Sequence, residues 1–372
     1  MKLLTVNVGS SSVRLSAFSM EHGEQRRVAT YHGAQDPSKA NAVLSEVLSD
    51  WNLDSFDAVV HRIVHGGRTL VKPCLLDAGI EAQMLDLAEL APLHQPAALA
   101  WIKACREALG ESVPQVAVFD TAFFAELPEV AASYALPRAL CAKYGVRRYG
   151  FHGLAHQNMW RQWCLLHKRT EGDGRLITLQ LGSGCSMAAI KHGQPLDTSM
   201  GFSPLEGLVM ATRSGDIDPG LLTFLQRNEG LTAVQLEQLL NEQSGLLGLS
   251  GTSGDMHRLM MSDDANARLA VAAFCYRARK YLGAYFAVLG GADAIMFGGG
   301  IGEHAAAIRR NILTGMEWCG IKLDDQANDA TVGHGGRISA NDSAVEVWVV
   351  QVDEAEILAS EAMSILPMAG NQ

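Results

Sequence analysis

The sequence contains no closely spaced cysteine pair. Its seven cysteines are scattered from Cys74 to Cys319, and no CxxC motif occurs. An odd, dispersed set is typical of reduced thiols and not of a disulfide framework. We therefore expect a protein of a reducing compartment, the cytoplasm.

Long uninterrupted hydrophobic runs are also missing. The longest apolar stretch, residues 281–301, is broken by glycines and by Asp293. The opening run MKLLTVNVG is too short for the core of a signal peptide. These patterns predict neither a membrane span nor a secretory leader.

Positive charge is scarce. The chain has 30 Lys and Arg against 40 Asp and Glu, a formal net charge of −10, which argues against a nucleic-acid partner. It does not exclude an anionic substrate, because a cleft can be locally positive on an acidic protein. The length of 372 residues favours two domains over a single core.

Three common ligand-binding signatures are absent. The sequence has neither a GxxxxGK[ST] phosphate loop nor a GxGxxG dinucleotide fingerprint, so a bound nucleotide would need another architecture. Zinc is the obvious alternative for a chain with 12 histidines. No HxH or HExxH spacing occurs, and His152 and His156 alone are too few ligands, so the pattern does not favour zinc.

Two strand–turn–strand patterns are present, far apart in the chain. Residues 2–8 and 13–18 flank a glycine–serine turn, and residues 176–181 and 187–190 flank another small-residue turn. Each pattern predicts a hairpin whose turn exposes N–H groups and hydroxyls. Their recurrence indicates two similar halves that face each other.

Helical and strand patterns alternate through the rest of the chain. Helical spacing covers residues 40–51, 96–109, 231–240 and 265–289, and short apolar strands are expected at 58–60, 115–119, 294–297 and 345–350. Asp353 is positioned to cap a last helix. This alternation predicts the α/β class.

Arginines and carboxylates follow several of these strands. Arg62 lies at the end of a strand, Arg213 just ahead of a turn, and Asp120 directly after an apolar strand. A fixed guanidinium stabilises the charge that spreads over a transferring phosphoryl group, whereas a surface salt bridge is the simpler alternative for either arginine. Glu354, after the last strand, is a candidate Mg²⁺ ligand, since Mg²⁺ needs only one or two carboxylates besides phosphate and water.

Histidines and glycines complete the candidate site. His94 and His152 stand in turns flanked by proline or glycine, where a structural role is the alternative to a bond with a phosphoryl oxygen. The run of residues 298–302, GGGIG, follows a strand and precedes a helix. Glycines there let a nucleotide approach the backbone, although a tight turn without a ligand explains them equally well.

Taken together, segments along nearly the whole chain resemble the acetate kinase family. In order from residue 7 to about residue 360 they are NVGSSSVRL, HRIVHGG, APLHQPA, AVFDTAF, YGVRRYGFHG, LDTSMGFSPLEGLVMATRSGDIDPG, SGLLGLSG, FGGGIGE and VDEAEILA. The block from Leu196 to Gly220 is far more specific than any of the short motifs.

The resemblance implies the fold of actin-like ATPases, sugar kinases and heat-shock ATPases, with two similar α/β domains around a central cleft. Residues 1–123 and a returning helix in 356–372 would form the N-terminal domain, and residues 124–355 the nucleotide-side domain. It also implies a homodimer and a Mg²⁺ cofactor that Mn²⁺ can replace.

The resemblance also implies roles for individual residues. Arg62 and Arg213 would hold the carboxylate and the migrating phosphoryl group, and His152 would bond an oxygen of that group. His94 would support the same site, and Asp120 would orient or support Arg213 or a metal. Glu354 would bind Mg²⁺ through water. Four residues would line a small acyl pocket: Val64, Leu93, Phe151 and Pro204.

On the donor side the resemblance implies two sets of contacts. The phosphate region would comprise Asn7, which would also serve the metal, with Ser10 and Ser12. The nucleotide would meet Arg14, Gly182, Ser183, Gly184, Asp255, Met256, His257, Gly299, Gly300, Ile301 and His304.

Most departures from the family pattern lie toward this donor side. The family's usual lysine is Arg14, its stacking arginine is His257, and further changes occur at Gln180, Ser183 and His304. On the acceptor side, Gln95 and Phe124 replace the family's asparagine and histidine.

The sequence thus predicts an enzyme that transfers phosphate reversibly between ATP and acetate, giving acetyl phosphate and ADP. A propionate or butyrate kinase, or a kinase of the same fold that uses GTP or pyrophosphate, is the first alternative. A non-catalytic binding protein that kept the fold is the second.

Overall fold

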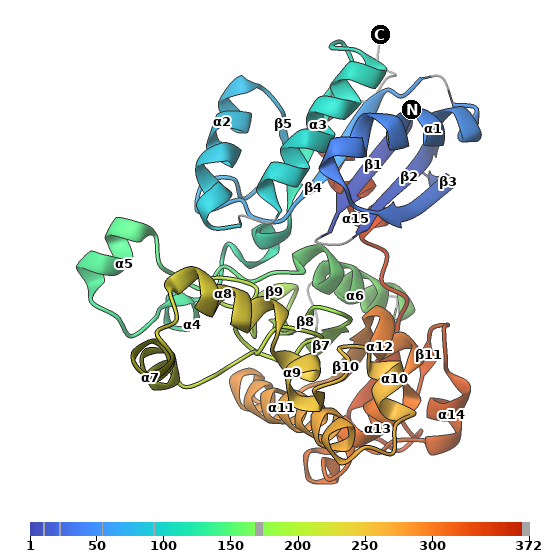
Figure 1. Ribbon diagram of the computed structural model, residues 1–372. Helices are drawn as coiled ribbons and strands as arrows, with labels where there is room; N and C mark the ends of the chain where they lie inside the picture. Colours follow the sequence, from blue (N-terminus) through green and yellow to red (C-terminus); the bar gives the residue numbers. More distant parts are fainter. Residues whose placement is uncertain (10–11, 22–23, 54, 92–93, 168–173, 367–372) are drawn as a thin grey trace. The chain divides into compact units, whose positions relative to one another are not determined.

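The computed structural model describes residues 1–9, 12–21, 24–53, 55–91, 94–167 and 174–366, which form two compact units (Figure 1). The first unit comprises Met1–Ala125 together with the described residues from Asp353 onward, and the second comprises Glu126–Val352. The chain therefore leaves the first unit and returns to it for its last helix. Glu354, expected in the second domain, lies in the first unit.

A six-stranded mixed sheet forms the centre of the first unit, in the order β3-β2-β1-β4-β6-β5. Strands β1, β4 and β6 are parallel, whereas β2, β3 and β5 run antiparallel to their neighbours. The strands are β1 (Lys2–Val8), β2 (Ser12–Glu21), β3 (Glu24–Ala34), β4 (Ala58–Ile63), β5 (Cys74–Leu75) and β6 (Gln115–Phe119). The first hairpin, β1–β2, is confirmed.

Helices cover both faces of this sheet. On one face, alternate residues of β1 and β2 bury against α1 and α3, with Leu44 and Trp101 fully buried in that layer. On the other face α15 packs against β1, β4 and β6. Its N-cap is Asp353, as expected, and the carboxylate accepts hydrogen bonds from the amides of Ala355 and Glu356. The helices are α1 (Ala40–Trp51), α2 (Ala78–Asp86), α3 (Gln95–Leu109) and α15 (Glu354–Met363), with 3₁₀ turns at Pro37–Lys39, Leu87–Glu89 and Asp120–Phe124.

The sheet of the second unit repeats this topology strand for strand. Its order is β9-β8-β7-β10-β12-β11, with β7, β10 and β12 parallel and the other three antiparallel to their neighbours. The strands are β7 (Arg175–Leu181), β8 (Cys185–Lys191), β9 (Gln194–Thr198), β10 (Ala294–Gly298), β11 (Gly336–Arg337) and β12 (Glu346–Val349). The expected α/β fold of two similar halves is therefore confirmed.

The helices of the second unit differ widely in how far they are buried. The long helix α11 (Ala265–Leu289) packs on β7, β8 and β9, and α6 (Gly153–Leu166) packs on β7 and β10. By contrast, α5 (Arg138–Tyr144) and α7 (Pro219–Glu229) contain no buried residue. The remaining helices are α4 (Glu129–Ala132), α8 (Ala233–Glu242), α9 (Gly245–Ser250), α10 (Met256–Met260), α12 (Gly299–His304), α13 (Ala306–Leu313) and α14 (Asp325–Ala330), with a 3₁₀ turn at Glu317–Cys319.

Among the described residues, no helix combines the length and the apolar character needed to span a membrane.

Candidate active site

A cluster of four polar side chains forms where the parallel strands of the first sheet end. Asn7 and Arg62 are register partners near the ends of β1 and β4, Asp120 follows β6, and Glu354 begins α15. Carboxyl ends of parallel strands meet at one sheet edge, which explains why residues so distant in sequence converge.

Hydrogen bonds connect the four members. Arg62 Nη2 donates to Asp120 Oδ2 at 2.7 Å, and its Nη1 donates to Asn7 Oδ1 at 3.2 Å. Asn7 Nδ2 in turn donates to Glu354 Oε2 at 2.6 Å. Arg62 Nε lies 4.0 Å from the same Glu354 oxygen. Asp120 was expected to support Arg213 or a metal, and the structure shows it bonded to Arg62.

Charge in this cluster is negative overall, because one guanidinium faces two carboxylates. Burial pulls the pKa of Arg62 down, but the charges of Asp120 and Glu354 outweigh that effect and raise the pKa above its ordinary value. Arg62 is only 9% exposed and Asp120 is fully buried. The guanidinium is therefore permanently charged and held in one orientation.

This cluster offers hard oxygen atoms that suit a divalent cation. Glu354 uses one carboxylate oxygen to accept from Asn7, which leaves its second oxygen for another ligand. Within the parts of the chain that the structure describes, no three His, Cys, Asp or Glu side chains converge as a metal site. A Mg²⁺ ion here would therefore take Glu354, directly or through water, and complete its shell with water and phosphate oxygens, as Mg²⁺ commonly does.

A second cluster forms in the second unit around the turn between β7 and β8. His152 occupies the left-handed region, with φ of 57°, as the N-cap of α6. Its Nδ1 lies 2.9 Å from Ser186 Oγ on β8. A Cβ atom at Gly184 would lie 3.4 Å from His152 Nε2 and 3.6 Å from Arg213 Nη1. His152 and Arg213 thus approach the same glycine, whose missing side chain leaves the space beside them open.

Arg213 carries a charge that its own unit does not neutralise. Its Nη1 donates to the carbonyl oxygen of Pro204 at 3.2 Å, and it forms no ion pair with a described carboxylate of the second unit. Burial lowers the pKa of Arg213 below its ordinary value, although not enough to discharge a guanidinium at neutral pH. The nearby Cys185 thiol stays neutral, because burial raises its pKa to about 12. An uncompensated cation beside a histidine and a glycine turn can bind an oxyanion.

Two of the four residues expected to line the acyl pocket, Val64 and Phe151, are apolar and buried, whereas Pro204 is half-buried. Val64 directly follows Ile63, the last residue of β4, and is 6% exposed. Phe151 directly precedes His152 and is 1% exposed. Pro204 lies in the second unit beside Arg213. Leu93 lies outside the described residues, so its part in the pocket remains a prediction. His94 is the N-cap of α3 in the first unit.

On the donor side, the backbone conformation and the close surroundings of Gly299 require a glycine. Gly299 has φ of +75°, and a Cβ there would lie 2.7 Å from the carbonyl oxygen of Leu181. Gly300 is exposed with open space at its Cβ position, and Ile301 and His304 follow in the same short helix, α12. Gly182, Ser183 and Gly184 form the β7–β8 turn.

The other donor-side residues differ in exposure. Asp255 is the N-cap of α10 and accepts from the amide of His257, whose side chain is exposed. Met256, expected at the nucleotide, is buried, with 4% exposure. In the first unit, Arg14 is exposed on β2 and Ser12 begins that strand. Ser10 lies outside the described residues.

Three residues of the second cluster were not singled out for it from the sequence: Thr178, His156 and Ser186. All three are buried, and they form a hydrogen-bonded row that ends at His152. The spacing of four residues between His152 and His156, at the start of a helix, was the available signal, because such residues share one face.

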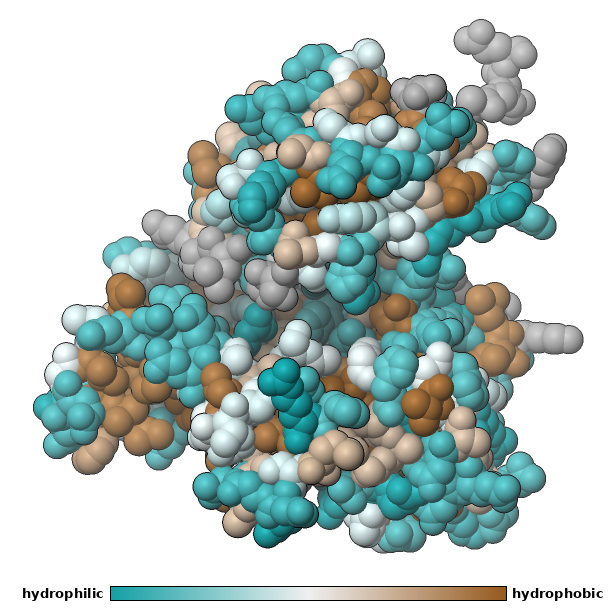
Figure 2. Space-filling view, turned by 45° about the vertical axis from the view of Figure 1, so that its right-hand side comes forward, coloured by the Kyte–Doolittle hydropathy of each residue, from teal (hydrophilic) through white to brown (hydrophobic). Residues whose placement is uncertain are grey.

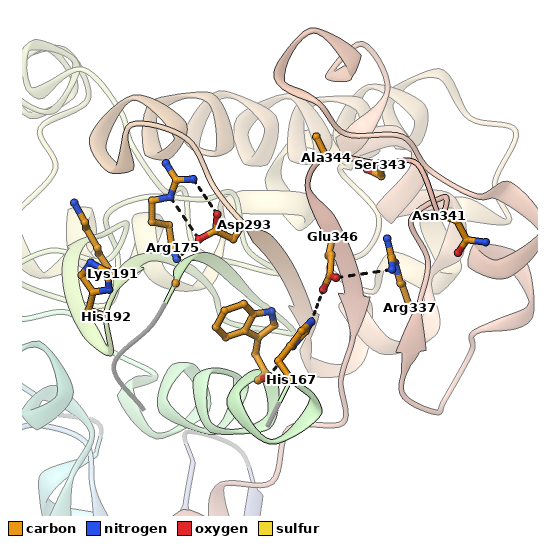
Figure 3. Close-up of a pocket in the computed structure, with 12 residues that line it drawn as sticks. His167, Arg175, Lys191, His192, Asp293, Arg337, Asn341, Ser343, Ala344 and Glu346 are labelled. Carbon is orange, nitrogen blue, oxygen red and sulfur yellow. Dashed lines mark hydrogen bonds and ion pairs between the residues drawn. The ribbon is translucent and has the colours of Figure 1, made fainter. Parts of the chain in front are cut away.

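A cavity of about 620 Å³ opens at the opposite, amino-terminal ends of β7, β10 and β12 (Figure 3). Its charged side chains largely neutralise one another: Arg175 binds Asp293, and Glu346 lies between His167 and Arg337. None of the residues predicted from the sequence lines it. Charges paired in this way hold neighbouring segments together, so this cavity is a weak candidate for the catalytic site.

Comparisons with known proteins agree with this geometry. The model of the Acetokinase family matches residues 16–360. An acetate kinase of Chloroherpeton thalassium is 47% identical over 315 residues, covering 83% of this chain and 76% of its own. The crystal structure of an acetate kinase from Porphyromonas gingivalis aligns with a TM-score of 0.88 at 38% identity, over 98% of this chain and 100% of that one. A propionate kinase from Francisella tularensis aligns with a TM-score of 0.89 at 31% identity, with the same coverages.

Proposed function

The chain belongs to the acetokinase family, and from this we propose that it transfers a phosphoryl group reversibly between ATP and acetate, giving acetyl phosphate and ADP. The observation that carries the proposal is Arg213, a cation without a carboxylate partner in its own unit, beside His152 at a glycine turn. Such a group suits the charge that develops on a transferring phosphoryl group.

In the proposed reaction an acetate oxygen attacks the γ-phosphorus of ATP in line with the leaving ADP. The new O–P bond forms as the bond from phosphorus to the β,γ-bridging oxygen breaks, and ADP leaves with that electron pair. Arg213 and His152 act on the non-bridging oxygens of the migrating group. No covalent enzyme intermediate is needed, because positioning and charge stabilisation provide most of the acceleration.

The proposed role of the first cluster depends on its rigidity and negative charge. Arg62 is fixed by Asp120 and Asn7, so it meets an anionic oxygen without having to be reoriented. Glu354 and Asn7 would hold Mg²⁺, which supplies positive charge to the nucleotide phosphates when it is bound. The net negative charge of the cluster favours a cation there, and Mn²⁺ would serve in the same way.

We assign acetate as the preferred acceptor because Val64 and Phe151, two of the residues expected to contact the acyl group, are apolar and buried. Propionate is the second candidate, supported by the likeness to the Francisella tularensis propionate kinase. One methylene changes the preference of an apolar pocket by only about 1–3 kcal/mol, so both acids should be tested. The changes at His257 and His304 lie on the donor side, so the preference for the base of the nucleotide should be tested as well.

We also propose a homodimer. The helix α7 has Leu221 and Phe224 about half exposed and buries none of its residues within the protomer, as is true of α5. In Figure 2 hydrophobic surface gathers at the lower left, the side of the second unit that carries α4, α5 and α7 in Figure 1. Short helices without a packed face gain little stability alone, so we expect a second copy of the chain to pack against them.

The oligomeric state can be measured directly by light scattering during gel filtration. Phe224→Asp should shift the protein toward the monomer. Val28→Asp, which changes an apolar residue of similar exposure in the first unit, should not. A wild-type monomer at micromolar concentration would contradict this part of the proposal.

None of the seven cysteines, all of which the structure describes, forms a disulfide. We take this as support for a reducing, cytoplasmic environment, since disulfides form and persist in oxidising ones.

The deciding experiment measures acyl phosphate formation by hydroxamate trapping. ATP, GTP and pyrophosphate are each tested with acetate, propionate and butyrate, with Mg²⁺, with Mn²⁺ and with a chelator. We expect the highest kcat/KM for ATP with acetate and no turnover without a divalent ion. Lys191→Ala, in the cavity of Figure 3, should keep full activity. The proposal fails if none of the three acids is phosphorylated.

A further inference from the structure

Arg213 lies in a loop of the second unit, residues 207–216, whose two ends bond to each other. The amide of Asp216 donates to the carbonyl oxygen of Gly207 at 3.0 Å, and the amide of Gly207 donates to Asp216 Oδ1 at 2.8 Å. Gly207 has φ of +108°, and a Cβ there would lie 2.6 Å from the carbonyl oxygen of Ser199. The Arg213 loop therefore begins and ends at one point, where a glycine is required.

Two side chains of α11 contact this closure. Tyr281 Oη donates to Asp216 Oδ2 at 2.8 Å, and Arg277 Nη1 lies 3.4 Å from the same oxygen. Arg277 Nη1 also donates to the carbonyl oxygens of Gly207 and Asp216, at 3.1 and 3.2 Å. Residues four apart share one face of a helix, so a single face of α11 holds both ends of the loop.

The Asp216 carboxylate is engaged through both of its oxygens. Burial and the charge of Asp216 raise the pKa of Tyr281 far above its ordinary value, so the phenol keeps its proton and stays a donor. Asp216 is only three residues from Arg213 in the sequence, but its charge is paired with Arg277. This pairing explains how Arg213 keeps an uncompensated charge although a carboxylate is close in the sequence.

The interior of the Arg213 loop is held by backbone contacts. The amide of Met210 donates to the carbonyl oxygen of Arg213 at 3.2 Å, and the amide of Ala211 donates to that of Ser183, in the β7–β8 turn, at 3.0 Å. A Cβ at Gly245, in α9, would lie 2.6 Å from the carbonyl oxygen of Arg213. Only the closure of the loop thus depends on side chains that a substitution can remove.

We infer that Tyr281 and Arg277 are positioning residues for Arg213, which keep its loop closed through Asp216 and direct the guanidinium at the space beside Gly184. The inference rests on the proposed function, which gives Arg213 the transferring phosphoryl group as its partner. An electrostatic stabiliser is most effective when its position is set before the reaction begins. Loosening the closure should therefore slow the reaction without removing any group that acts on the substrate.

The first test removes one hydroxyl. Tyr281→Phe keeps the ring and should lower kcat about threefold to tenfold with unchanged KM for ATP and acetate, because Arg213 acts in the transition state. Tyr285→Phe is the matched control. Tyr285 lies one turn further along α11, its ring contacts that of Tyr281, and its buried hydroxyl has no hydrogen-bond partner among the described residues. Its kcat should equal that of the wild type.

A second pair of variants tests the guanidinium. Arg277→Gln removes the ion pair and should lower kcat more, by about tenfold to a hundredfold. Arg279→Gln is its matched control, because Arg279 also donates from α11 to two carbonyl oxygens, those of Ile312 and Asn311, which lie outside the Arg213 loop. Its kcat should not change. Equal losses at positions 277 and 279 would overturn the inference, since they would reflect the packing of α11 in general.

A double variant separates positioning from general damage. If Tyr281 acts through Arg213, adding Tyr281→Phe to Arg213→Ala should lower kcat no further. A further loss as large as the one that Tyr281→Phe causes alone would overturn the inference, because the hydroxyl would then act through another group.

An NMR readout needs no reaction. In ¹H–¹⁵N spectra of protein labelled at arginine, the Nε–H signal of Arg213 is assigned with Arg213→Lys. Tyr281→Phe should shift this signal, whereas Tyr285→Phe should leave it in place. An unmoved signal in Tyr281→Phe would overturn the inference even if the enzyme phosphorylates acetate. Conversely, the expected shift in a protein that phosphorylates no acid would leave the closure standing and remove the proposed function.

Discussion

Arg62 and Arg213 carry the same guanidinium group, but the two units surround it differently. In the first unit Arg62 is buried, donates to Asp120 and Asn7, and lies near Glu354. In the second unit Arg213 donates to one carbonyl oxygen and pairs with no described carboxylate of that unit. The two sheets have the same topology, so the difference arises from the side chains at their carboxyl ends and not from the backbone.

The contrast teaches how one architecture can serve two kinds of charge. One arginine and two carboxylates give the first cluster a net charge of −1, which favours a divalent cation. The second cluster has an uncompensated cation and a hydrogen-bond donor, which favours an anion. A phosphoryl transfer enzyme needs both, because the nucleotide brings a metal and the transferring group brings negative charge.

The largest effect is expected from Arg62→Ala. It should lower kcat at least about a hundredfold, the usual scale for loss of an electrostatic stabiliser. It should also reduce the free energy of unfolding by about 3–5 kcal/mol, because Asp120 and Glu354 lose their counter-charge in a buried place. Steady-state kinetics and denaturant titration measure the two losses.

The same substitution in the second unit should separate these two losses. Arg213→Ala should lower kcat at least about a hundredfold as well, but the free energy of unfolding should change by no more than about 0.5–1 kcal/mol, since no ion pair is broken. Both quantities come from the measurements used for Arg62→Ala. Equal destabilisation by the two substitutions would break the comparison, and near-normal turnover would remove Arg213 from the mechanism.

Local sequence patterns predicted the two sheets but not the partners of the two arginines. Strands β1 and β6 and helices α1 and α11 have the bounds expected from their apolar periodicity. That Arg62 bonds Asp120 depends on β4 lying next to β6, and no local pattern encodes strand order. The bond between Asn7 and Glu354 joins residues 347 positions apart. Resemblance identified these residues as important, whereas only the structure gave them their hydrogen bonds.

The hydrogen-bonded row behind His152 shows the same limit. Thr178 and Ser186 are small polar residues within apolar strands, and nothing in their own segments distinguishes them from other buried hydroxyls such as Thr198. Their place in the row follows from β7 and β8 pairing beneath α6, which is a tertiary arrangement. Residues 10 and 93 lie outside the described residues, so their assigned roles remain predictions from resemblance.

Acid should destabilise β4 of the first unit more than β10, which occupies the same position in the second sheet. Burial lowers the pKa of His61 on β4 to about 4, although its bond to Gln115 opposes the shift. The unfolded chain, with a histidine pKa near 6.5, then binds more protons than the folded chain between about pH 6.5 and 4. Stability is therefore full above pH 6.5 and falls as the pH drops through this window, by up to about 3 kcal/mol.

Hydrogen exchange can locate that loss. After correction for intrinsic rates, amides of β4 should lose protection between pH 7 and pH 5, whereas those of β10, which contains no histidine, should lose less. His61→Gln keeps a hydrogen-bond donor for Gln115 and should reduce the acid sensitivity of β4. Equal loss in both strands would mean that His61 does not set the acid limit.

The smallest effect concerns a cation added to the second unit. His257 is exposed beside Asp255, at the start of α10, where the family pattern has an arginine that can stack on a base. A guanidinium over an aromatic ring contributes roughly 0.5–2 kcal/mol, so His257→Arg should lower the KM for ATP by a few-fold to about thirtyfold. The kcat should stay nearly constant, because a contact with the base stabilises the bound substrate and the transition state equally.

The matched control adds the same cation away from the donor side. His192→Arg changes an exposed histidine in the cavity of Figure 3 and should leave the KM for ATP unchanged. Measuring ATP, GTP and pyrophosphate on both variants distinguishes base stacking from a general gain of positive charge, since pyrophosphate has no base. If His257→Arg tightens pyrophosphate as much as ATP, the added charge acts on phosphate. If it tightens neither, another residue holds the base, and the anion-binding character of the second unit does not extend to α10.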